Sequence, residues 1–176
     1  NAACDGDGCG DGVEVAANPT PADAMSRPRL ADSVADFSGV QGQGGWYYGY
    51  RNYTQDGGGD DYDADNDFVA FDVGDWTGSK WDLGGGAPWT ELGPNGTHPN
   101  GTNSEPQEEH WTVRRWVAGE LSGTTPVAIT WTARKTNSHN NGVTGSLHIN
   151  GKMVDSKVVE GDDQAVTYTH LQLRRM

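Results

Sequence analysis

The clearest local pattern in the chain is an alternation of apolar with small or polar residues over 127–133. Successive side chains of a β-strand point to opposite faces, so a period of two indicates a strand with one buried face. On this reading the buried face carries Val127, Ile129, Trp131 and Ala133. We therefore predict a half-buried strand over Val127–Ala133.

The same alternation recurs over Val143–Ile149 and predicts a β-hairpin. It places Gly145 and Leu147 on the buried face and His148 on the polar face. Asn150-Gly151 follows at once, and this pair favours the positive φ angles of a type I′ turn. We therefore expect Val143–Ile149 to pair antiparallel with Lys152–Val159.

Several other segments predict strands, and almost nothing follows a helical period. The Gly-rich connections between them are typical of an all-β, two-sheet antiparallel β-sandwich of jelly-roll type. Residues 74–109 contain three Trp among many Gly, Pro and Asn, and a loop of that length is either functional or internally packed. The further strand candidates are Val34–Phe37, Trp46–Arg51, Asp67–Val73, His110–Val117 and Val166–Leu173, the last with a bulge near His170.

Length and composition narrow the class of protein. The 176 residues suit one domain of ordinary size, which we place at 30–176 after a leader and Pro-containing linker at 1–29. The formal charge of -13 repels phosphate backbones and anionic headgroups, which argues against nucleic-acid partners. No apolar run approaches the roughly 20 residues of a membrane span. Because the chain opens with Asn1, we expect a processed or excised product that is extracellular or at the cell surface.

The leader contains a candidate calcium loop, DGDGCGDGVE. Side-chain oxygens alternate along it, a Gly permits the sharp turn, and a terminal Glu closes the shell, as calcium loops require. Ala3 stands where an Asp should open the loop. The segment resembles thrombospondin type 3 and dockerin-like repeats, which implies a calcium-rigidified spacer; the alternative is a flexible acidic leader. The ligands would be Asp5, Asp7, the carbonyl of Cys9, Asp11 and Glu14.

Two other features bear on cations and redox state. Cys4 and Cys9 either form a local disulfide in an oxidising compartment or stay unpaired. A second acidic run either binds calcium or is a solvated loop, because its carboxylates alternate as ligands do but no turn-forming Gly follows them. The residues of that run are Asp61, Asp63, Asp65 and Asp67.

Aromatic residues provide the candidate ligand-binding surface. Sugar rings stack on aromatic planes, so a secreted sandwich with surface aromatics often binds glycans. In a strand Trp46, Tyr48 and Tyr50 would share one face, however, and at least one set of rings would then pack in the core. The candidates are Trp46, Tyr47, Tyr48, Tyr50, Trp76, Trp81 and Trp89.

Catalytic signatures are weak. The five His show no HExxH spacing, and the chain contains no nucleophile-elbow motif. A glycosidase pair drawn from Glu108, Glu109 and Glu120 would need a distance between its carboxylates that sequence cannot give. We predict a non-enzyme in which Arg114 and Arg115 pair with carboxylates. Three sequons are compatible with a secreted glycoprotein, at Asn52, Asn95 and Asn100.

A second resemblance spans most of 31–169. It rests on ADFSGVQGQGGWYYGY, HWTVRRWVAGE and ITWTARKTNSHNNGVTGSLHINGKMV, which are similar to a jelly-roll module of large secreted bacterial proteins and, in arrangement, to carbohydrate-binding modules. Related sequences continue with another strand, and a missing strand would leave an edge open to donation from another chain. The resemblance implies a structural or adhesive subunit that assembles with copies of itself or other extracellular subunits, or else a polysaccharide-binding module.

Overall fold

The structure is a computed structural model that describes residues 29–59, 61–103, 105–119, 126–135 and 142–160 and the backbone of 172–175. The chain divides into two units, 1–32 and 33–176, and the fold below belongs to the second. Several predictions lie outside the described residues. These are the calcium loop at Asp5–Glu14, the Cys4–Cys9 disulfide, the role of Glu120 and the segment 166–171.

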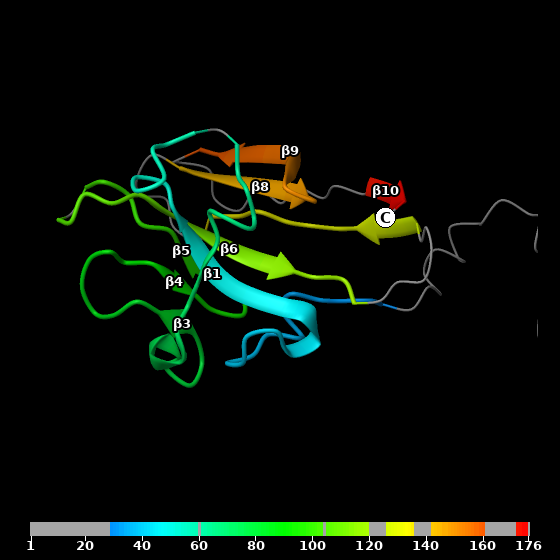
Figure 1. Ribbon diagram of the computed structural model, residues 1–176, viewed down its shortest axis with the longest axis horizontal. Coiled ribbons are helices and arrows are strands. Elements are labelled where there is room, and N and C mark those ends of the chain that lie inside the picture. Colours follow the sequence, from blue (N-terminus) through cyan, green and yellow to red (C-terminus); the bar gives the residue numbers. More distant parts are fainter. Residues whose placement is uncertain are drawn as a thin grey trace, which may run out of the picture. The chain divides into compact units, whose positions relative to one another are not determined.

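The central element is an antiparallel pair of long strands, β1 (Trp46–Asn52) and β6 (His110–Trp116). Their register runs from Trp46 opposite Trp116 to Asn52 opposite His110. The short strand β2 (Val69–Ala70) pairs with the other edge of β1. Figure 1 shows β1 and β6 side by side along their whole length. The strands predicted at 46–51 and 110–117 are confirmed, and the one at 67–73 is reduced to two residues.

The two faces of the β1–β6 pair carry different side chains, because directly opposed residues share a face. Tyr48 and Arg114 lie on one face, which we call the Tyr48 face. Arg51 and Trp111 lie on the other, the Arg51 face. Gly49, also on the Arg51 face, has no room for a side chain, since a Cβ there would lie 2.2 Å from the carbonyl oxygen of Val69 and collide with the Phe68 ring.

The long segment 74–109 folds into a small sheet of its own and is internally packed. It contains β3 (Trp81–Asp82), β4 (Glu91–Leu92) and β5 (Thr97–His98), paired antiparallel in that order. Trp81 and Leu92 from this sheet are almost fully buried. The Trp81 ring stacks on Tyr48, with 6.0 Å between centroids, so the sheet supplies core to the Tyr48 face.

The predicted hairpin is present as β8 (Val143–Ile149) and β9 (Lys152–Val159). Asn150 and Gly151 have φ angles of 50° and 75°, as a type I′ turn requires. The register shifts between Leu147 and His148. His148 is half-buried, with its ring 5.3 Å from that of Tyr62 and its Nε2 3.2 Å from Oγ of Ser146.

Two further strands, β7 (Pro126–Ile129) and β10 (Gln172–Arg175), pair antiparallel with each other. The alternation predicted for 127–133 is confirmed, since Val127 is buried and Ile129, Trp131 and Ala133 are half-buried while the residues between them are exposed. The strand itself ends at Ile129, earlier than predicted.

One predicted strand is wrong. Residues 34–37 form part of a turn, in which the Phe37 amide donates to the Val34 carbonyl oxygen at 3.3 Å. Phe37 nevertheless packs on the Tyr48 ring, 4.8 Å away and edge-on. Phe37 thus contributes to the core from a turn, and a segment of four residues is too short for its pattern to distinguish a strand from a turn.

The fold class is all-β. Described residues form small antiparallel sheets of two or three strands, and their helical content is limited to the 3₁₀ turns η2 (Gln43–Gly45) and η3 (Val73–Asp75). Among these residues, no helix has the length and apolarity needed to cross a membrane.

Candidate functional site

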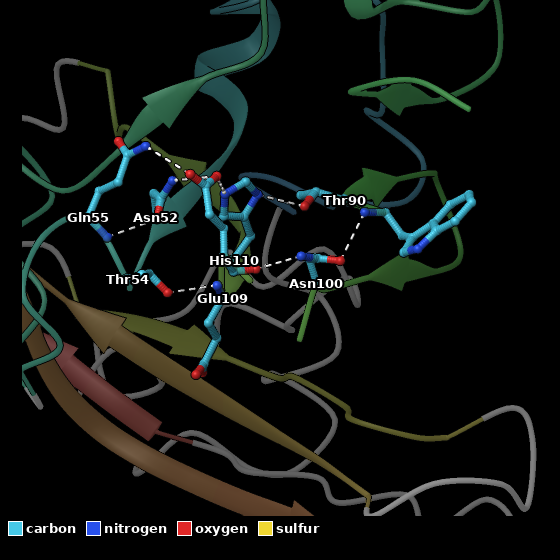
Figure 2. A network of polar contacts seen from close by, with 9 residues as sticks. Asn52, Thr54, Gln55, Thr90, Asn100, Glu109 and His110 are labelled. Atoms are coloured by element: carbon cyan, nitrogen blue, oxygen red, sulfur yellow. Dashed lines mark hydrogen bonds and ion pairs between the residues drawn. The ribbon is translucent and has the colours of Figure 1, made fainter. Parts of the chain in front are cut away.

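Three segments far apart in the sequence meet at His110, the first residue of β6. His110 lies opposite Asn52 at the end of β1. Its backbone exchanges two hydrogen bonds with Asn100, at 3.1 and 2.9 Å. Thr90, just before β4, contacts its side chain. Figure 2 shows Thr90 and Asn100 on one side of His110 and Asn52 with Gln55 on the other.

The His110 imidazole lies between a hydroxyl and a carboxylate. Its Nδ1 is 2.8 Å from Oγ1 of Thr90, and its Nε2 is 3.4 Å from Oε2 of Glu108, a contact that is electrostatic and not a well-formed hydrogen bond. The ring also stacks on Tyr50 with centroids 4.6 Å apart. Burial lowers the pKa of His110, and Glu108 opposes that effect without reversing it. The imidazole is therefore neutral at pH 7.

The order carboxylate, imidazole, hydroxyl is one that nucleophilic catalysis uses, but solvent scarcely reaches the imidazole or the hydroxyl. Thr90 is 0% exposed and His110 is 2% exposed. A nucleophile must contact its substrate, so this arrangement holds the fold together as it stands. Glu108, one of the predicted glycosidase carboxylates, is a member of this network, and Glu109 accepts a hydrogen bond from the Trp111 indole at 2.6 Å.

Amide side chains complete the network and change the interpretation of two sequons. The Asn52 side chain donates to the Glu108 carboxylate at 3.3 Å and accepts from the backbone N–H of Gln55 at 3.0 Å. The Asn100 side chain donates to the Glu108 carbonyl oxygen. Both Asn side chains are buried, at 9% and 3% exposure. A glycan cannot be accommodated on either in this fold, which leaves Asn95, which is exposed, as the accessible sequon.

The backbone of Trp89 is hydrogen-bonded directly to this network. Its backbone N–H donates to Oδ1 of Asn100 at 3.0 Å, and the next residue, Thr90, accepts a hydrogen bond from the Leu83 amide at 3.1 Å. The backbone is thus held on both sides, while the side chain is 47% exposed. Trp89 forms no ring contact or indole hydrogen bond with the residues that the structure describes. It is a fixed aromatic platform facing solvent.

The other aromatic candidates are placed differently. Tyr48 and Trp81 are buried in the core, and Trp46 is nearly so. Tyr50 stacks on His110, and Trp76 packs against Trp81 at 5.2 Å. Tyr47 is half-buried. The prediction that these rings form a glycan surface is therefore wrong for Trp46, Tyr48 and Trp81, whose faces are covered by protein.

The second acidic run is organised by its own hydrogen bonds. Oδ1 of Asp63 accepts from the Asp65 amide at 2.9 Å, and Oδ2 of Asp67 accepts from the Asp63 amide at 2.8 Å. The hydrogen bond from the Asp65 backbone is the main cause of a lowered pKa at Asp63. Asp61 is exposed. No group of three acidic, His or Cys side chains in the described residues is arranged to hold a metal, and calcium binding stays a prediction.

The two adjacent arginines have separate roles. Arg115 pairs with Asp65 at 3.0 Å, as predicted. The prediction is wrong for Arg114, which donates instead to the carbonyl oxygens of Ser33, Pro94 and Gly93. Burial lowers the pKa of its guanidinium. Arg114 thereby connects β6 to two loops without a carboxylate partner among the described residues.

Sequence reasoning missed the roles of Thr90, Asn100 and His110. Nothing in their spacing links them, because the contacts depend on how the 74–109 segment folds back on β6. Trp89 was one of seven candidates, and a local signal did set it apart: it follows the run Gly84–Gly86 and Pro88, a composition typical of an exposed loop.

Comparison of the chain with protein-family models, with curated proteins and with solved structures finds no match in any of the three.

Proposed function

We propose that this chain is a non-catalytic, adhesive module of an extracellular or cell-surface protein, and that it adheres by binding a neutral polysaccharide through Trp89. The observation that carries this proposal is that Trp89 has an exposed side chain and a backbone hydrogen-bonded to a buried network. Of the seven Trp, Trp89 alone is exposed, at 47%.

An exposed indole on a backbone that is held in place suits a sugar for a physical reason. The apolar face of a pyranose ring covers an aromatic plane and removes its surface from water. Because the Trp89 backbone is already held, binding has to order little more than the side chain and the ligand, and this preorganisation favours affinity. The acidic surface, with a formal charge of -13, repels anionic glycans at low salt, so the ligand class is neutral polysaccharide.

The non-catalytic part of the proposal is supported by the burial of the one acid, imidazole and hydroxyl arrangement found in the described residues. A substrate would have to reach Thr90, which is fully covered. The finer architecture is also a proposal: the covered faces of the β1–β6 pair suit a jelly-roll sandwich, in which both sheets contribute to one core.

Two further parts of the proposal concern residues outside the described part. Calcium bound by Asp5, Asp7, Cys9, Asp11 and Glu14 would rigidify the leader, and the leader would donate a strand to a neighbouring subunit. Chelation with EDTA and measurement of particle mass in solution test these parts. Loss of a calcium-dependent oligomer on chelation supports them, and a monomer under both conditions contradicts them.

The Trp89 platform is tested by retention of the purified full chain on insoluble neutral polysaccharides such as cellulose, xylan, mannan and chitin. Trp89→Ala should weaken binding about 10- to 100-fold, as expected for loss of a central aromatic anchor. Trp89→Tyr should restore part of the affinity.

The matched control is Val73→Ala, because Val73 is 88% exposed and is not part of the platform. This variant should bind as the unaltered chain does. Equal retention of Trp89→Ala and Val73→Ala, or release of soluble sugar from the polymer by the unaltered chain, contradicts the proposal.

A further inference from the structure

The described residues contain three Asn-Gly pairs, and the fold holds the three Asn side chains in different ways. The pairs are Asn95-Gly96, Asn100-Gly101 and Asn150-Gly151. In such a pair the backbone nitrogen of Gly can attack the side-chain amide of the preceding Asn, because Gly has no Cβ to hinder the approach. The reaction requires the Asn side chain to turn toward that nitrogen, so the fold decides which pair reacts.

Asn95 lies in the exposed half of the turn between β4 and β5. The Gly93 amide closes this turn by donating to the Gly96 carbonyl oxygen at 2.8 Å. Arg114 holds the carbonyl oxygens of Gly93 and Pro94, and these anchors end one residue before Asn95. Asn95 and Gly96 are both exposed, and the Asn95 side chain makes no hydrogen bond to the described residues.

Asn100 has the same neighbour in sequence but is held at both ends of its amide. Its Oδ1 accepts from the backbone N–H of Trp89 at 3.0 Å, and its Nδ2 donates to the Glu108 carbonyl oxygen. The residue is 3% exposed, and its backbone exchanges two hydrogen bonds with His110. To reach the nitrogen of Gly101, the side chain would have to break both of its hydrogen bonds inside the buried network. The folded chain therefore protects Asn100.

Asn150 is exposed but lies in a more constrained turn. Ring closure requires Asn to rotate about its Cα–C bond, which changes the shape of the turn. Asn150 occupies a two-residue turn at a φ of 50°, between β8 and β9, which have seven and eight residues. The turn that contains Asn95 joins two strands of only two residues each, and short strands resist local rearrangement less. Asn95 is thus the pair that should react first.

We propose that Asn95 is a site of spontaneous covalent modification, which converts its amide through a succinimide to aspartate and isoaspartate. The Gly96 nitrogen loses its proton and attacks Cγ of Asn95, a C–N bond forms, the bond from Cγ to Nδ2 breaks, and ammonia leaves. Water then opens the ring at either of its carbonyl carbons. The net reaction consumes one water and releases one ammonia, and it needs no oxidant or cofactor. This inference does not depend on the proposed function.

The modification would change the turn in two respects. Either product destroys the sequon Asn95-Gly96-Thr97, so attachment of a glycan to Nδ2 and loss of that nitrogen exclude each other. Isoaspartate also inserts a methylene carbon into the backbone of a four-residue turn. The age of the chain would therefore be recorded at Asn95 in any molecule that does not carry a glycan there.

The first test incubates the full chain, prepared without glycosylation, at pH 7 and pH 9 and follows each Asn by peptide mapping with mass spectrometry. Asn95 should be converted before Asn150, and faster at pH 9, because the attacking nitrogen must lose its proton. Asn100 should stay intact in the folded chain and should react like Asn95 once urea unfolds it. Conversion of Asn100 or Asn150 before Asn95 in the folded chain, or no conversion at Asn95, overturns the proposal.

The second test uses a matched pair of variants, Gly96→Ala and Gly101→Ala. Neither glycine has a positive φ, and a Cβ at either position meets no atom within 4 Å, so the fold accommodates both substitutions. Gly96→Ala should slow the loss of Asn95 about tenfold, which corresponds to a barrier raised by about 1.4 kcal/mol. Gly101→Ala should leave that rate unchanged. An equal rate of Asn95 loss in the two variants contradicts attack by the Gly96 nitrogen.

Discussion

The two faces of the β1–β6 pair use the same strands but are stabilised in different ways. On the Tyr48 face, rings pack on rings: Tyr48 contacts Phe37 and stacks on Trp81. On the Arg51 face, cations pair with carboxylates, as Arg51 does with Asp56 and Arg115 with Asp65. A period of two thus divides one sheet into a face held by apolar burial and a face held by charge. The stability of the first should be nearly indifferent to salt, and that of the second should not.

The largest expected effect is on the Tyr48 face. Trp81→Ala removes a ring that is 1% exposed and leaves a cavity against Tyr48 and Phe71. The free energy of unfolding should fall by about 3–5 kcal/mol. Urea unfolding measures it, and the loss should be the same in low and high salt. A loss below about 1 kcal/mol would show that the Tyr48 face is not the core.

The next effect is on the Arg51 face. Arg51→Met preserves much of the side-chain volume but leaves Asp56 without its cation, and should cost about 2–3 kcal/mol. Lys80→Met is the matched control, because Lys80 pairs with Asp82 and Glu91 at the surface, where ion pairs contribute about 1 kcal/mol or less. Equal losses in the two variants contradict the distinction between a buried and an exposed charge.

A smaller effect is expected from pH, and it involves one His associated with each face. The pKa values of His110 and His148 are both lowered, mainly by burial. The unfolded chain therefore takes up protons before the native state does, and stability should fall as the pH drops from about 6.5 toward 5.

Thermal unfolding across this range measures the effect. His110→Gln and His148→Gln should each flatten the pH dependence, and salt should change the two parts in opposite directions, because Glu108 raises the pKa of His110 whereas Arg51 lowers that of His148. If neither substitution alters the pH dependence of stability, that dependence arises from other groups.

The smallest effect is expected at Trp89, which belongs to neither face. Trp89→Ala should change the free energy of unfolding by no more than about 0.5 kcal/mol, because the backbone N–H that donates to Asn100 is kept. Chemical unfolding alongside Trp81→Ala measures it. A loss of several kcal/mol would mean that the Trp89 indole is part of the core.

Patterns with a local cause were predictable from the sequence. The turn at Asn150-Gly151 and its hairpin follow from the φ angles that this pair favours, and the alternation at 127–133 from the period of a strand. The strand predicted at 34–37 is wrong because a four-residue segment is too short for its pattern to separate a strand from a turn. The register shift at His148 has no signal in the sequence.

The sites were less predictable than the strands, because they depend on contacts between distant segments. Sequence identified the aromatic residues, and the Gly- and Pro-rich stretch before Trp89 indicates an exposed loop, but nothing in the sequence shows that Trp81 is covered. It offered carboxylates as partners for Arg114, where the structure uses carbonyl oxygens of two loops.

The central claim, that Trp89 is the platform for a neutral polysaccharide, is tested most directly by the indole N–H signals in an NMR titration with soluble oligosaccharides. Seven signals are expected, and Trp89→Phe identifies the one from Trp89. We predict that this signal shifts most as ligand is added, that those of Trp46 and Trp81 stay in place, and that the oligosaccharide remains intact. A Trp89 signal that does not move with any ligand retained by the chain, or one that moves less than those of the core, would contradict the account.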